Sequence, residues 1–147
     1  MGVLRELRRE TDSLLIGWVL VPEHFQLLIK SEPAEFTSRF MQEFKKRAAR
    51  RIIDTLLPNA LHPWCRRTLA RLRLPLRVHC DPRYRVWQRR FVPFNVYTEK
   101  KRLEKLDYTH QNPVSRRLVS SPDQWPWSSF RFYDLNDSSV LMVDRLT

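Results

Sequence analysis

Glycine is almost absent from this sequence, whose 147 residues include only Gly2 and Gly17. A P-loop or a dinucleotide-binding fingerprint needs several glycines at fixed spacing, because the backbone must approach the phosphate groups closely. Both kinds of site are therefore excluded. Any chemistry on phosphate would depend on side chains or on a bound metal ion.

Cysteine and long apolar runs are also scarce. Cys65 and Cys80 do not form a disulfide framework. The longest apolar run, residues 14–22, has the length of a strand and falls well short of the about 18 residues that can span a membrane. Residues 1–12 carry alternating charges and lack the apolar core of a signal peptide. We therefore expect a cytoplasmic protein with no membrane partner.

The charge, in contrast, is strongly unbalanced, with 27 Lys and Arg against 16 Asp and Glu and a formal net charge of +11. The hydrophobic fraction of 42% can supply a core, and the length fits one compact domain. Solubility does not require a field of this size, whereas phosphate contacts that release counterions make use of one. The sequence thus predicts a nucleic-acid partner, and DNA would make the protein nucleoid-associated.

The apolar pattern of the first half predicts helices and strands together. Residues 3–10 have one apolar face and predict a short amphipathic helix. Residues 14–21 predict a strand buried on both faces, and a tight turn leads into a second strand at 24–29, which completes a hairpin. Apolar residues at three- and four-residue steps then predict a long amphipathic helix over 36–57.

The second half is less regular. Residues 58–85 are rich in proline and arginine, and predict a basic insertion or loop with at most a short helix at 66–73. A strand is expected near 91–96, followed by a helix from 99 to about 111 that Pro113 stops.

The last part of the chain contains an aromatic segment, residues 125–130, which we expect to cover the core. After Asp134 the sequence looks frayed. The expected organisation is therefore one domain over 1–134 and a frayed C-terminal tail over 135–147.

Basic side chains gather on the second half of helix 36–57, in the aromatic segment before residue 94, and at the start of helix 99–111. Because these runs have few acidic neighbours, they favour a phosphate-facing surface over a merely solvated one. The residues that we expect to contact DNA are Lys45, Lys46, Arg50, Arg51, Arg85, Arg89, Arg90, Lys100 and Lys101.

Two short constellations are candidates for chemistry, and the first is His24-Phe25-Gln26. Alternate residues of a strand point to one face, so the imidazole of His24 and the amide of Gln26 project together. They could hold one edge of a divalent cation. Taken alone, the polar outer face of an amphipathic strand is the commoner explanation.

The second constellation is Tyr108 with Asn112, one turn apart on the same helix face. A tyrosine hydroxyl, with a pKa of about 10, is a poor nucleophile unless a nearby cation favours its anion. Asn112 could give that cation a third oxygen, although a core tyrosine and a helix end explain the isolated pair better. His110 points away from Tyr108, and we expect it near the DNA or in the helix packing.

Four separated blocks make this sequence resemble the single-tyrosine HUH transposases, in particular the REP-associated tyrosine transposases. The resemblance covers nearly the whole chain, through WVLVPEH (18–24), VWQRRF (86–91), YTHQNPV (108–114) and WPWSSF (125–130). It implies an α+β fold with a ferredoxin-like antiparallel sheet and helices on one face. The family begins with a further strand, which we expect to be missing here.

The resemblance also implies a function. Tyr108 matches the nucleophile that attacks a DNA phosphodiester and becomes joined to the 5′ phosphate. His24, Gln26 and Asn112 match the ligands of Mg²⁺ or Mn²⁺, with Gln26 standing where the family has a second histidine. An amide oxygen remains an acceptable ligand for a hard cation. The implied enzyme is a metal-dependent tyrosine transposase that cleaves and rejoins single-stranded or hairpin DNA, as a monomer or a homodimer.

Two other functions remain open. An inactive or truncated relative would bind DNA through the same basic and aromatic side chains without cleaving it. A small zinc-stabilised nucleic-acid binder would use His62, Cys65, His79 and Cys80, whose spacing matches no standard zinc finger.

Overall fold

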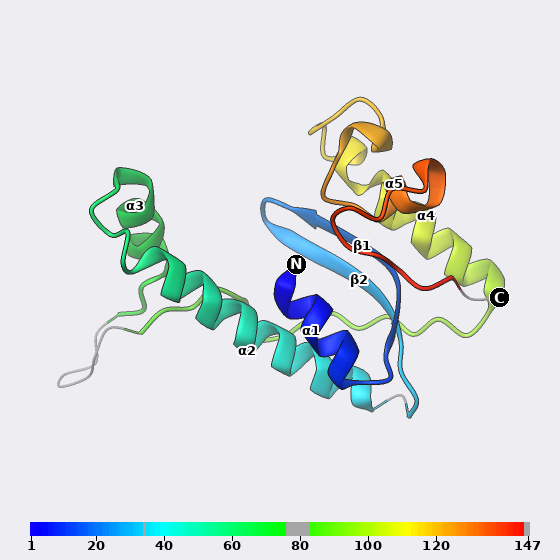
Figure 1. The fold of residues 1–147 in the computed structure, drawn as a ribbon, viewed down its shortest axis with the longest axis horizontal. Coiled ribbons are helices and arrows are strands. Elements are labelled where there is room, and N and C mark those ends of the chain that lie inside the picture. The colour runs from blue at the N-terminus through cyan, green and yellow to red at the C-terminus, as the bar shows by residue number, and fades with distance from the viewer. Residues whose placement is uncertain (34, 76–82, 146–147) are drawn as a thin grey trace. The chain divides into compact units, whose positions relative to one another are not determined.

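The computed structural model describes residues 1–33, 35–75 and 83–145. Within these ranges the chain is α+β, with a two-stranded antiparallel sheet and several helices (Figure 1). It divides into two compact units, Met1–Phe40 with Phe94–Thr147, and Met41–Pro93. The elements are α1 (Gly2–Glu10), β1 (Leu14–Val21), β2 (His24–Lys30), α2 (Phe36–Leu56), α3 (Pro63–Leu72), α4 (Glu99–Ser115), the 3₁₀ helix η1 (Pro122–Gln124) and α5 (Phe130–Leu135).

The β1–β2 hairpin is the centre of the first unit and confirms the predicted pair of strands. β1 is buried along most of its length because apolar side chains occupy both of its faces, as the sequence indicated. The strands pair antiparallel from Leu14 with Lys30 to Val21 with His24, with one irregularity between Leu15 and Gly17. The hairpin therefore fixes which β2 residues face the same side as a given β1 residue.

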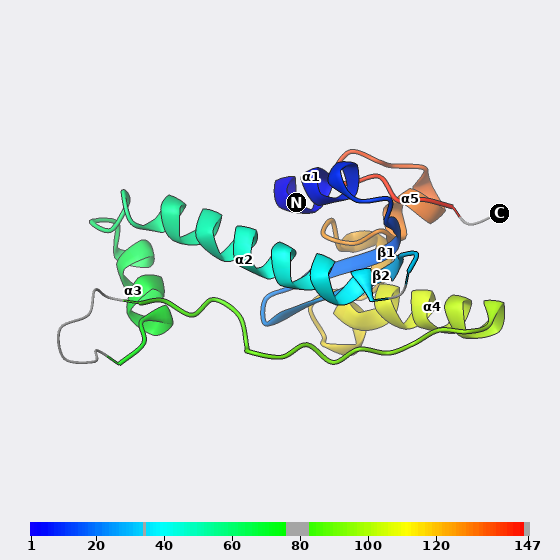
Figure 2. The same ribbon diagram turned by 90° about the horizontal axis from the view of Figure 1, so that it is seen from below.

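Helices lie on both sides of this hairpin. Figure 2 shows α1 on one side and α4 on the other, whereas the sequence led us to expect helices on one face. The apolar stripe of α1, formed by Val3, Leu4 and Leu7, is buried. On the other side, Gly17 lets α4 approach β1 closely: a Cβ atom at this position would lie 2.5 Å from Leu106 Cδ1.

The second edge of β1 is occupied by the segment that contains the aromatic block. Leu20 N donates to Trp127 O at 2.9 Å, and Ser129 N donates to Trp18 O at 2.9 Å. The Trp125 indole also donates to Leu20 O, while the Trp127 side chain is 47% exposed. The block was expected to cover the core, and its backbone also pairs with β1, which the sequence did not indicate.

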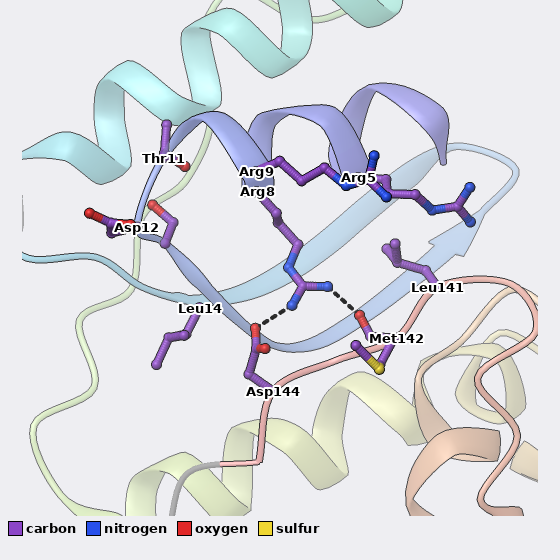
Figure 3. A pocket seen from close by; sticks show the side chains of 10 residues that line it. Arg5, Arg8, Arg9, Thr11, Asp12, Leu14, Leu141, Met142 and Asp144 are labelled. Atoms are coloured by element: carbon purple, nitrogen blue, oxygen red, sulfur yellow. Dashed lines mark hydrogen bonds and ion pairs between the residues drawn. The ribbon is translucent and has the colours of Figure 1, made fainter.

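Residues 137–145 belong to the first unit and pack within it, in contrast to the frayed tail expected after Asp134. Leu141 and Val143 are buried, and Asp144 N donates to Leu15 O at 2.7 Å. Arg8 of α1 forms an ion pair with Asp144 at 2.5 Å, which Figure 3 shows beside a pocket of about 510 Å³. Hydrogen bonds from Arg5 to Val140 O and from Arg8 to Met142 O add to these contacts, so α1 holds a short segment that has no strong periodicity.

α4 continues beyond the expected stop and contains Pro113 in its last turn. Proline removes one helical hydrogen bond, which usually ends or kinks a helix. Here the Pro113 ring is fully buried, and its carbonyl accepts a hydrogen bond from Leu118 N at 2.9 Å. Packing of the ring and closure of the helix end compensate for the missing bond.

The second unit contains most of α2, α3 and an irregular segment. α3 begins at Pro63, with His62 as its N-cap, and is longer than the helix expected at 66–73. An isolated bridge pairs Arg73 with Tyr84, and the Trp87 indole donates to Lys45 O at 2.9 Å.

The strand expected near 91–96 does not form, because these residues have no ladder partner in the described part of the chain. Of the expected basic insertion at 58–85, residues 76–82 lie outside the described ranges. Among the described helices, none combines the length and the apolar character that crossing a membrane requires.

Candidate metal and nucleophile site

The hairpin places His24 and Gln26 on the face that α4 covers. β2 pairs Gln26 with Val19, and cross-strand partners point to the same side of a sheet. Residues two apart on a strand also point to the same face, so His24 shares a face with Gln26, and Gly17 shares a face with Val19. Because Leu106 of α4 contacts Gly17 on this face, His24 and Gln26 point toward α4.

α4 contributes Tyr108 and Asn112 from successive turns. Asn112 is 7% exposed and thus buried, whereas Tyr108 is 58% exposed. The helix begins at Glu99 after the Thr98 side chain, which accepts a hydrogen bond from Lys101 N at 3.2 Å. Asn112 therefore lies in the protein interior, whereas Tyr108 is accessible from solvent.

An ion pair joins the hairpin turn to the end of α4. Arg116 Nη1 donates to Glu23 Oε2 at 2.7 Å, and both side chains are partly exposed. The next residue, His24, has a pKa below its usual value, mainly because of partial burial and then because of the Arg116 charge. His24 is thus close to the C-terminal end of α4 and favours its neutral form, which is the form that binds metals.

Two buried side-chain oxygens have no hydrogen-bond donor among the described residues: Gln26 Oε1 on the hairpin face toward α4, and Asn112 Oδ1 on α4 itself. A buried amide oxygen without a partner costs about 1–3 kcal/mol. Both atoms belong to predicted metal ligands, and carbonyl-type oxygens suit Mg²⁺ or Mn²⁺. With a neutral His24 nearby, the donor set fits a hard divalent cation.

The structure does not test the zinc alternative, because His79 and Cys80 lie outside the described residues. Within those residues, no three His, Cys, Asp or Glu side chains gather into a group that could hold a metal ion. His62 caps α3, where its Nδ1 accepts a hydrogen bond from Trp64 N at 3.3 Å. Cys65 is a free, half-buried cysteine.

Lys105 is a residue near Tyr108 that the sequence reasoning missed. Its Nζ lies 5.4 Å from the centroid of the Tyr108 ring and 4.1 Å from that of Phe94. The spacing of three residues on a helix could have indicated the first contact. The second contact could not be found in this way, because Phe94 lies in an irregular segment before the helix.

His110 lies in the helix packing, one of the two places expected for it. Its Nε2 is 2.9 Å from Ser129 Oγ, which also accepts a hydrogen bond from Trp18 N at 2.9 Å. The ring meets Phe130 edge to face at 5.5 Å between centroids. Burial, slightly offset by the Asp107 charge, lowers the pKa of His110 to about 4, so it is a neutral structural link between α4 and β1.

The predicted DNA contacts are divided between the two units. Lys100 and Lys101 lie at the start of α4 in the first unit, and Lys101 pairs with Glu104 at 2.7 Å. The other seven lie in the second unit, where Lys45 Nζ donates to Gln88 O and Lys46 pairs with Glu43 at 3.5 Å. The other residues of that unit predicted to contact DNA are all exposed, namely Arg50, Arg51, Arg85, Arg89 and Arg90.

Comparison with known proteins gives one local similarity. Over 45 residues the chain is 40% identical to a protein of Haemophilus influenzae named "Putative REP-associated tyrosine transposase". The match covers 31% of this chain and 26% of that protein, so the chain spans about a quarter of the length of the relative. No family model matches the chain, and no solved structure does.

Proposed function

We propose that this chain is a transposase-type protein that binds single-stranded or hairpin DNA and nicks it through a tyrosine nucleophile. The observation that carries the proposal is the pair of buried oxygens without a donor, Gln26 Oε1 on the hairpin face toward α4 and Asn112 Oδ1 on α4. Tyr108 lies on α4 one turn before Asn112, and its side chain is exposed. The name of the H. influenzae relative and the net charge of +11 support DNA as the substrate.

In the proposed reaction, Tyr108 Oη forms a bond to the scissile phosphorus and gives up its proton. The bond between phosphorus and the 3′ oxygen breaks, and that oxygen leaves as a 3′ hydroxyl after taking up a proton. The 5′ phosphate stays on the tyrosine. Attack by a 3′ hydroxyl on this phosphotyrosine releases Tyr108 and rejoins a strand, which is the chemistry that transposition needs.

His24, Gln26 and Asn112 would hold Mg²⁺ or Mn²⁺ through one imidazole nitrogen and two amide oxygens. Such an ion would act as a Lewis acid on the phosphate. The protein's own contribution is positional. The Glu23–Arg116 ion pair ties the turn before His24 to the end of α4, and the close packing at Gly17 sets the distance between helix and strand.

The decisive experiment is incubation of a 5′- and 3′-labelled DNA hairpin with the full chain and Mn²⁺. We expect a covalent protein–DNA adduct that survives denaturing electrophoresis and carries the 5′ phosphate. Tyr108→Phe should form no adduct while it still shifts the hairpin in a native gel, because only the hydroxyl is lost.

The matched control is Tyr97→Phe, which removes the hydroxyl of another exposed tyrosine in the same unit. This variant should form the adduct at the parent rate. Chelation of the metal should abolish the adduct in both proteins. If the parent binds the hairpin without forming an adduct, the chain is a DNA-binding relative without nicking activity, and the enzymatic proposal is wrong.

A further inference from the structure

Phe94, Lys105 and Tyr108 form an exposed surface at the side of α4, which we call the aromatic surface. Phe94 is 61% exposed and Tyr108 is 58% exposed, so two rings are open to solvent in the first unit. The Lys105 ammonium lies 4.1 Å from one ring centroid and 5.4 Å from the other. The two centroids are therefore at most 9.5 Å apart, the sum of these distances.

Exposed aromatic rings lose the benefit of burial, so their presence on a strongly basic chain calls for a ligand that has both flat apolar faces and negative charge. Unpaired nucleotides have this combination, because each base offers a π face and each phosphate one charge. Paired bases inside a duplex do not expose their faces. A membrane surface would require a larger apolar area than two rings provide.

The Lys105 ammonium, which lies near both rings, adds a second favourable contact for such a ligand. Cation–π attraction holds Lys105 over Phe94 and beside Tyr108, which limits the freedom of a long side chain. A phosphate that approaches this ammonium brings its neighbouring base within reach of one of the rings. Binding at this place would align the strand beside the Tyr108 hydroxyl.

We propose that the aromatic surface binds unpaired bases of single-stranded DNA, with a base stacked on Phe94 and a phosphate paired with Lys105. This inference rests on the proposed function for the identity of the strand, and it deepens that function by assigning a binding subsite next to the nucleophile. Lys105 is here a substrate-binding residue, since its ammonium pairs directly with a phosphate of the strand.

The test measures the affinity of the full chain for a labelled oligothymidylate of about 12 nucleotides, by fluorescence anisotropy and without metal, so that no cleavage occurs. Phe94→Leu should weaken binding at least about fivefold, because the stacking face is lost. Its dependence on salt should be unchanged, since no charge is removed. Lys105→Met should weaken binding and also reduce the salt slope by about 0.7.

Phe36→Leu is the matched control, because it makes the same substitution at a residue of the same unit that is 49% exposed. It should bind as the parent does. A 2-aminopurine base in the oligonucleotide should be quenched by the parent and by Phe36→Leu, but much less by Phe94→Leu. Thermal unfolding of each variant checks that the fold is intact.

Equal affinities of Phe94→Leu and the parent for the single strand would overturn the inference. An equal loss for a blunt duplex would do the same, because a stacking site should leave duplex binding unchanged. Failure of the nicking proposal gives a different result. In that case the parent forms no adduct with Mn²⁺, while the binding arms, measured without metal, still separate Phe94→Leu from Phe36→Leu.

Discussion

His110 and Asn112 are both buried on α4, but the protein satisfies the polar atoms of the two residues differently. His110 has Ser129 Oγ as a hydrogen-bond partner, while Asn112 Oδ1 has no partner among the described residues. Buried polar atoms are nearly always hydrogen-bonded, so the unpaired oxygen of Asn112, two residues from a paired imidazole, needs an explanation. The pairing gives His110 a structural role, and the unpaired oxygen of Asn112 supports the metal-ligand role that we propose for it.

The lowered pKa of His110 makes a prediction about acid stability. In the folded protein the pKa is about 4, mainly because of burial, against 6.5 for the unfolded chain. Between these values the unfolded chain binds a proton that the folded chain does not, so the free energy of unfolding falls as the pH drops from about 6.5 to about 4. The loss should reach about 3 kcal/mol at most.

The check is urea denaturation at several pH values for the parent and for His110→Gln. The variant should be less stable at pH 7 because it loses packing, but its stability should depend less on pH in this range. Ser129→Ala, which removes the hydrogen-bond partner and keeps the imidazole, should retain the slope. If the free energy of unfolding depends on pH equally in the parent and in His110→Gln, another group causes the loss of stability in acid.

Some features of the site could be derived from sequence, and others could not. The i, i+2 spacing of a strand put His24 and Gln26 on one face, and the structure brings that face toward α4. Whether Tyr108 is buried or exposed could not be deduced, since helical spacing does not show which turn leaves the core. The contact of Lys105 with Phe94 depends on an irregular segment, whose path no periodicity predicts.

At the scale of elements, the predictions succeeded where one local pattern decides the structure. The apolar stripes of α1 and α2, the apolar run and turn of the hairpin, and the N-cap of α4 are local signals, and these elements form within a few residues of the expected bounds. The expectations that were wrong involve tertiary contacts. Burial of Pro113 lets α4 continue, and residues 137–145 are held by Leu141, Val143 and the Arg8–Asp144 ion pair.

The packing of α4 on β1 predicts a specific sensitivity at Gly17. A methyl group there would lie 2.5 Å from Cδ1 of the buried Leu106, so the leucine side chain would have to shift. Gly17→Ala should therefore lower the free energy of unfolding by about 1–3 kcal/mol, as overpacking does in other cores. Because α4 carries Tyr108 and Asn112, the variant should also form less DNA adduct.

Leu106→Ala supplies the control through a double-mutant cycle measured by urea denaturation. Each single change should destabilise the protein, the first by a clash and the second by a cavity. Together they should cost clearly less than the sum, because the added methyl group fills part of the space that the leucine leaves. Additive costs would show that the two residues do not meet.

At the scale of the whole molecule, the candidate site and most of the expected DNA contacts belong to different units. The site lies in the first unit, while seven of the nine basic residues lie in Met41–Pro93. Phosphate contacts add affinity without sequence preference, and catalysis requires a fixed geometry. The division therefore predicts that DNA affinity and DNA chemistry can be altered separately.

Arg89→Gln with Arg90→Gln tests this separation, because both residues lie in the second unit and are exposed. The double variant has a net charge of +9, from +11 less two. We expect the salt slope of single-stranded DNA binding to fall by about 1.4, at about 0.7 for each phosphate contact. At saturating DNA, the rate of adduct formation should stay at the parent level.

Arg5→Gln with Arg9→Gln gives the same net charge of +9 from changes on α1, outside the expected contacts. If the overall field alone attracts DNA, both double variants lose the same affinity and the same salt slope. If Arg89 and Arg90 contact phosphates, only their variant loses about two contacts, because the slope counts the counterions that local contacts release. Anisotropy titrations of both variants over a range of salt concentrations distinguish local phosphate binding from attraction by net charge.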